Sequence, residues 1–130
     1  MVHILAPISA GELIDKITIL QIKLEQLTDA GKLDNVRHEL DQLTRIRTQS
    51  KLDNDELSLL EMQLLEINRE LWQVEDDLRE REQARDFSAG FVELARLVYK
   101  LNDQRSALKK KINETTGSSI VEEKSYVSYL

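Results

Sequence analysis

A run of apolar residues at heptad spacing dominates the middle of this 130-residue chain. Between residues 53 and 85 the apolar positions alternate in steps of three and four without a miss, at Leu57, Leu60, Leu64, Ile67, Leu71, Val74 and Leu78. Such a seam is typical of an α-helix that packs lengthwise against other helices. At 1.5 Å per residue the helix would be a rod on the order of 45 Å long. A domain of this size has a radius of gyration of only about 14 Å, so the helix must extend beyond its own domain or break.

The same segment also carries apolar residues away from this seam. Met62, Leu65 and Trp72 lie roughly 80–160° around the helix from Leu64, at about 100° per residue. A helix that is apolar on two sides is covered on both. We therefore expect a second copy of the chain to pack along this helix, which would make the protein a homodimer.

Three further segments are predicted to be helical, and the whole chain is expected to be all-α. The four helices are expected at about residues 10–28, 33–50, 54–85 and 89–114. Capping boxes at Ser9–Glu12 and Asp53–Glu56 predict two of the starts, and Gly31 is expected to take a left-handed conformation and stop the first helix. One domain, residues 1–130, would form an antiparallel four-helix bundle, with its two long C-terminal helices in a coiled-coil-like hairpin. The tail at 118–130 is expected to dock on the bundle.

Composition and charge exclude several classes of function. The chain has no cysteine, which removes disulfides and thiolate chemistry, and its two histidines, His3 and His38, are too far apart to suggest a metal site. No catalytic or nucleotide-binding motif occurs, so no cofactor is expected. Residues 53–87 hold twelve acidic and four basic side chains, which argues against nucleic acid as a partner. No segment is apolar enough to cross a membrane and the start does not read as a signal peptide, so a cytoplasmic protein is expected.

One arginine breaks an otherwise apolar pattern. Arg105 stands in the seam of the last helix, seven residues after Val98 and seven before Ile112, and needs an anion or a route to solvent. Asp15 lies on a second apolar stripe of the first helix, and an up-and-down bundle would bring the two to the same height. Two interpretations stay open: a buried ion pair that fixes helix register, or a pocket for a small anion.

The residues also resemble a known family. The stretches GELIDKITILQIK, NVRHEL, FVELARLVYKLNDQRSALKKKIN and VEEKSY resemble an uncharacterised family of small bacterial proteins with no established activity, which implies a helical fold. The resemblance covers nearly the whole chain. It overlaps the candidate ligand-binding positions, which are Glu12, Asp15, Lys16, Asn102, Asp103, Arg105, Lys109, Glu123, Lys124 and Tyr126.

A second resemblance concerns the first helix alone. LIDKITILQIKLEQL is similar to the first helix of the all-helical chorismate mutases, intertwined dimers whose arginines and lysines hold a dicarboxylate substrate in a bundle cavity. That likeness implies catalysis through electrostatics and enforced conformation. The first helix here has no arginine, however, and the arginine expected at its far end is missing.

The sequence does not determine a function. Our first hypothesis is a non-catalytic helical scaffold or protein-interaction module that is homodimeric through residues 54–85. The alternative is a small-anion-binding protein, or a chorismate-mutase-like enzyme, with a pocket around Arg105 and Asp15. A binder should show a concave pocket with unpaired donors around Arg105, whereas a scaffold should show no such pocket.

Overall fold

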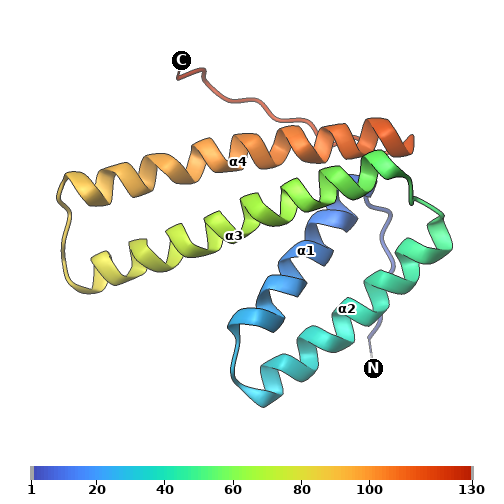
Figure 1. Cartoon of the computed structure of the whole chain (residues 1–130), viewed down its shortest axis with the longest axis horizontal. Coiled ribbons are helices and arrows are strands. Elements are labelled where there is room, and N and C mark those ends of the chain that lie inside the picture. Colours follow the sequence, from blue (N-terminus) through green and yellow to red (C-terminus); the bar gives the residue numbers. More distant parts are fainter. Residues whose placement is uncertain (1, 130) are drawn as a thin grey trace.

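The computed structural model describes residues 2–129, in which there are four helices and no strands. The helices are α1 (Ala10–Gln26), α2 (Ala30–Ser50), α3 (Asp55–Gln83) and α4 (Ala89–Thr116) (Figure 1). The prediction of an all-α chain with four helices is confirmed.

The start of α1 follows the predicted cap, whereas the turn after it does not follow the prediction. Ser9 is extended, and its hydroxyl accepts a 3.1 Å hydrogen bond from the amide of Glu12. Gly31 was expected to be a left-handed stop, but it lies in the first turn of α2. Asp29 caps that helix by accepting a 2.9 Å hydrogen bond from the amide of Lys32. An aspartate at the N-cap stabilises a helix start, so α2 begins three residues earlier than predicted.

The start of α3 also corrects a prediction. The N-cap is Asn54, whose side-chain oxygen accepts a 2.7 Å hydrogen bond from the amide of Leu57. Asp53 instead binds Arg47 at the end of α2, at 2.9 Å. Aspartate and asparagine are both good N-cap residues. Because Asp53 forms an ion pair with Arg47, Asn54 is the residue that caps α3.

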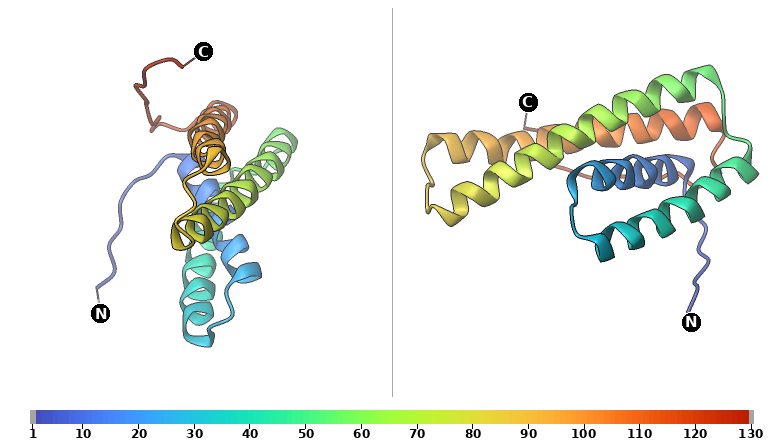
Figure 2. Two further views of the ribbon diagram at one scale, coloured as in Figure 1. Left: turned by 90° about the vertical axis from the view of Figure 1, so that its left-hand side faces the viewer. Right: turned by 60° about the horizontal axis from the view of Figure 1, so that its bottom comes forward.

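The long helices α3 and α4 form a hairpin, and α1 crosses one half of it (Figure 1). α1 packs against all three other helices, whereas α2 packs closely against α1 alone. Figure 2 shows α1 between the α3–α4 hairpin and α2. α3 runs unbroken for 29 residues. Of the two alternatives predicted for so long a helix, it extends and does not break. The other half of the hairpin extends past α1 and α2.

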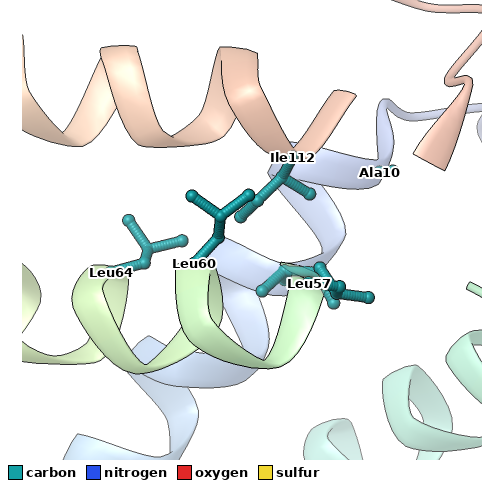
Figure 3. Close-up of a cluster of buried hydrophobic side chains, with 6 residues drawn as sticks. Ala10, Leu57, Leu60, Leu64 and Ile112 are labelled. Atoms are coloured by element: carbon teal, nitrogen blue, oxygen red, sulfur yellow. The ribbon is translucent and has the colours of Figure 1, made fainter. Parts of the chain in front are cut away.

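The α3 seam is buried in two clusters. Figure 3 shows the first, which joins the start of α1 to the ends of the hairpin helices through Ala10, Leu57, Leu60, Leu64 and Ile112, with Ile14 as a further member. The second lies in the extended half and is built on Leu71, Val74 and Leu101. A fully buried leucine contributes about 1.5–3 kcal/mol. Asn68, only 4% exposed, lies on α3 between the two clusters.

Candidate functional site

Asp15 and Arg105 meet between the two apolar clusters. Arg105 donates from Nε to Oδ1 of Asp15 at 2.9 Å and from Nη2 to Oδ2 at 2.5 Å. The Asp15 side chain is 1% exposed and that of Arg105 is 28% exposed. The hydrogen bonds to Asp15 raise the pKa of the Arg105 guanidinium above its ordinary value, despite the opposing effect of burial. The guanidinium therefore stays charged.

Two uncharged residues, Asn68 and Thr18, complete the hydrogen-bond network around Asp15. The amide of Asn68 donates to Oδ1 of Asp15 at 3.0 Å and to the hydroxyl of Thr18 at 2.9 Å. That hydroxyl donates in turn to the backbone carbonyl of Asp15 at 2.7 Å. No buried side-chain nitrogen or oxygen in residues 2–129 lacks a partner. These hydrogen bonds join α1, α3 and α4 in one buried and fully satisfied network.

A second contact between α1 and α4 lies one turn along. Lys109 is bonded to Glu12 at 2.7 Å and to Glu122 of the tail at 3.1 Å, and its side chain is 12% exposed. Burial lowers the pKa of the Lys109 ammonium, but its hydrogen bonds to the two carboxylates outweigh burial, and the net pKa is raised. Lys16 is exposed and lies 3.7 Å from Glu12.

A third contact fixes the helix ends. The amide of Gly11 donates to Oδ1 of Asn113 at 2.6 Å, and the amide of Ala10 donates to the hydroxyl of Ser118 at 3.1 Å. Arg105, Lys109 and Asn113 are four residues apart and so share one face of α4. These contacts and the Ser9 cap satisfy the first amides of α1, so its N-terminus is not an open anion site.

On the outer side of α4 a groove separates the helix from the C-terminal tail. The tail, residues 118–129, has no helix or strand and runs back beside α4 (Figure 1). Glu122 anchors it at Lys109, and at its far end the hydroxyl of Tyr129 donates to Asp103 at 2.8 Å. The rings of Tyr129 and Tyr99 meet edge to face, with centroids 5.0 Å apart.

We call this hollow the α4–tail groove; its volume is about 740 Å³. It is lined by Val98, Tyr99, Asn102, Asp103, Arg105, Ser106 and Lys109 of α4 and by Glu122, Lys124, Tyr126, Val127, Ser128 and Tyr129 of the tail. Six of the ten candidate residues are among them: Asn102, Asp103, Arg105, Lys109, Lys124 and Tyr126.

The other four candidates lie elsewhere. Glu12 and Asp15 are on α1, where they bind the cations of the groove, and Lys16 pairs with Glu12 outside it. Glu123 lines a smaller adjoining hollow. Five further residues of the groove and of the contacts between α1 and α4 were not among the predicted site residues: Asn68, Thr18, Asn113, Tyr99 and Tyr129. The signal for Asn68 was its amide beside the apolar seam, and that for Asn113 was its place four residues after Lys109.

A second hollow, the α1–α3 notch, opens where α1 leaves the hairpin. Its volume is about 400 Å³, and it is lined by Ile19 and Ile22 of α1, by Asn68, Leu71, Trp72, Glu75, Asp76 and Arg79 of α3, and by Asn102 and Arg105 of α4. Trp72 is half-buried there, and the Glu75 and Asp76 carboxylates are exposed and form no ion pair within residues 2–129. Arg105 therefore borders both hollows.

No three potential metal ligands converge in the described part of the chain. None of the helices within residues 2–129 is long and apolar enough to cross a membrane. No curated protein and no solved structure matches the chain. Residues 4–130 match the model of a family of unknown function, DUF6165, which confirms the predicted resemblance to an uncharacterised family. The chain therefore belongs to the DUF6165 family.

Proposed function

We propose that this protein binds a small organic molecule with an anionic group in the α4–tail groove. The observation that carries the proposal is the groove itself, at about 740 Å³. Pockets for small ligands measure about 300–1,000 Å³ and combine apolar and aromatic walls with a few fixed polar groups. Tyrosines and valines supply the apolar wall here, and Arg105, Lys109 and Lys124 supply the polar groups.

The two α4 cations are held in place by carboxylates of α1. Arg105 makes three hydrogen bonds, two to Asp15 and one of 3.4 Å to Asn102. A guanidinium has five N–H donors, so two have no partner among residues 2–129 and remain for a ligand. Such fixed donors lose little entropy when they bind. Unpaired donors beside a concave surface favour the binding hypothesis over a purely structural ion pair.

The geometry gives less support to a chorismate-mutase-like reaction. The groove lies on the outer side of α4, and each of the two α4 cations is already matched by a carboxylate of α1. A dicarboxylate substrate would need an excess of positive charge. We therefore assign binding to the groove and no catalytic step.

A thermal-shift screen against organic acids, phosphates and nucleotides tests the proposal. A ligand at about 100 times its Kd stabilises a protein by about 2.7 kcal/mol. The test variant is the double substitution Asp15→Asn with Arg105→Met, which removes both charges and leaves neither buried alone. Lys32→Met, at an exposed cation of α2 that does not line the groove, is the control. We expect a ligand that shifts wild type and the control but not the double variant; an equal shift in all three would contradict the proposal.

We also propose that a second copy of the chain packs in the α1–α3 notch, as the two-sided apolar character of α3 predicts. The hairpin extends beyond α1 and α2, and Trp72 is left half-buried in the notch. Glu75 and Asp76 border it, while Lys110 and Lys111 at the other end of the hairpin are exposed; none of the four has an ion pair within residues 2–129. In a two-fold dimer each notch receives the partner's hairpin, and unlike charges would meet. The mass of the protein in solution tests this arrangement.

A further inference from the structure

We propose that the groove takes an elongated aromatic monocarboxylic acid, and that Glu122 occupies the ligand's carboxylate position when the groove is empty. This inference rests on the proposed binding function and names the ligand class. Its starting point is a carboxylate of the protein that already lies between two of the groove's cations.

The contacts of Glu122 are those expected of a bound carboxylate. One oxygen lies 3.1 Å from Nζ of Lys109, and the other lies 2.8 Å from Nζ of Lys124. The Glu122 side chain is 41% exposed and belongs to a segment without helix or strand. Glu12, the other partner of Lys109, is fixed on α1. Of the two acids on Lys109, therefore, Glu122 is the one that a ligand can replace without disturbing a helix.

The balance of charge selects a single negative charge. Three cations, Arg105, Lys109 and Lys124, line the groove, and a fourth, Lys16, pairs with Glu12 beside it. Four acids lie among them, Glu12, Asp15, Asp103 and Glu122. When Glu122 moves out, four cations face three acids. A monocarboxylate then restores the balance, whereas a phosphate dianion would add one more negative charge with no cation to match it.

The end of the groove away from Lys109 determines which uncharged part of a ligand can bind there. Tyr99 and Tyr129 line it, and their rings already meet edge to face with centroids 5.0 Å apart. Aromatic rings bind further rings in such arrangements. Tyr99 and Lys109 are ten residues apart on α4, or about 15 Å at the helical rise. A ligand that reaches both ends is therefore elongated and carries its carboxylate at one end.

Three probes with the same body and different head groups test the inference: para-biphenylcarboxylate, its carboxamide and the corresponding phosphonate. Their affinities are measured by calorimetry on the full chain, for wild type, Glu122→Gln and the control Glu39→Gln. Glu39 is an exposed acid of α2 that does not line the groove. We expect the carboxylate to bind best, and Glu122→Gln to tighten its binding about tenfold by freeing two charge-assisted hydrogen bonds. Glu39→Gln should leave the affinity unchanged, and the carboxamide should gain little from either substitution.

The outcomes separate this inference from the proposed function. If the carboxylate binds and Glu122→Gln does not tighten it, or if the phosphonate binds tighter, the inference is wrong and the groove remains a binding site. If none of the three probes binds wild type or Glu122→Gln, aromatic monocarboxylates are excluded, and the thermal-shift screen alone decides the proposed function. Chemical shift changes in Asn102, Ser106 and Lys109 on binding locate the probe, and changes confined to the α1–α3 notch would also overturn the inference.

Discussion

Gly11 and Asn113 set the closest approach of α1 to α4. The amide of Gly11 donates to Oδ1 of Asn113 at 2.6 Å, and a Cβ on Gly11 would lie 2.5 Å from the backbone carbonyl oxygen of Lys109. That oxygen belongs to a helix and cannot move alone. Glu12 and Asp15 reach Lys109 and Arg105 because the helices are this close, so the glycine positions the two ion pairs beside the groove.

Gly11→Ala should therefore destabilise the fold, by about 1–3 kcal/mol, the usual cost of overpacking a close contact. Gly31→Ala is the matched control, because a Cβ there would meet only the Asp29 carboxylate at 3.4 Å. Alanine is a better helix former than glycine, so the control should be neutral or more stable. Urea denaturation of the two variants gives the comparison, and equal stability of the two would contradict the close approach.

The two members of the buried ion pair should differ in their sensitivity to substitution. Arg105→Met leaves the Asp15 carboxylate, 1% exposed, without its cation, and should cost about 3–5 kcal/mol. Asp15→Asn leaves a guanidinium that is 28% exposed and can turn to water, so its cost should be smaller. The double variant should be less destabilised than the sum of the two. A double-mutant cycle from denaturant unfolding measures the coupling, and additive costs would show that the pair does not set register.

Much of the packing of α1, α3 and α4 was predictable from the sequence. The spacing of the apolar residues and the charged residue that interrupts it indicate the same helix contacts. The seam from Leu57 to Leu78 predicted α3. Arg105, which needed an anion or a route to solvent in an apolar seam, indicated Asp15 on α1 as a possible partner. Asn68 was not predictable as a partner of Asp15. It follows Ile67 directly, and consecutive helix residues point about 100° apart, so only the crossing of α1 over α3 decides that its amide is buried.

The groove was not predictable for a different reason. Its outer wall is the tail, whose apolar residues have no helical or strand period. No sequence pattern therefore predicts that Tyr129 lies beside Tyr99. Local sequence patterns also predicted the wrong N-cap for α3, where Asp53 and Asn54 are both suitable. Such choices depend on a partner distant in sequence, here Arg47.

The contact of Tyr129 with Asp103 should appear in the titration of the phenol. The hydrogen bond to Asp103 and burial raise the pKa of Tyr129 above its ordinary value of about 10.0. For a raised pKa, the stabilising contact is complete below the ordinary value and is lost as the pH rises through the raised one. Asp103→Asn should lower the pKa of Tyr129 towards the ordinary value, whereas Asp34→Asn, on α2, should leave it unchanged. Tyrosine ring resonances followed against pH measure both, and an unchanged pKa in Asp103→Asn would show that the tail end is not held there.

The ion pair between Glu122 and Lys109, the other contact that holds the tail on α4, should be lost at acid pH. Hydrogen bonds from Lys124 and Lys109 hold the pKa of Glu122 below its ordinary value of about 4.5. For a lowered pKa, the contact is complete above the ordinary value and is lost as the pH falls through the lowered one. Lys124→Met should raise the pKa of Glu122 towards the ordinary value, and Lys111→Met should not. Carboxyl carbon resonances followed from neutral pH downwards test this, and a Glu122 that titrates alike in both variants would contradict the contact.

The dimer proposed at the α1–α3 notch makes a prediction about charge. The chain has a mass of 15.1 kDa, so light scattering should give twice that value for wild type. Reversing both notch carboxylates, Glu75→Lys with Asp76→Lys, should give the monomer, because Lys110 and Lys111 of the second copy would meet like charge. The same change of charge at two exposed acids of α2, Glu39→Lys with Asp41→Lys, is the control and should leave the dimer intact.

A mixed sample gives the stronger test of the dimer. Reversing the lysines in a second chain, Lys110→Glu with Lys111→Glu, should let it pair with the notch variant, although each would be monomeric alone. The reason is that unlike charges then meet in both notches: the lysines in the notch of the first variant meet the glutamates of the second, and the unchanged carboxylates in the notch of the second meet the unchanged lysines of the first. A monomeric mass for wild type at every concentration would exclude the arrangement. A dimer that survives in the notch variant would place the second copy on another face of α3.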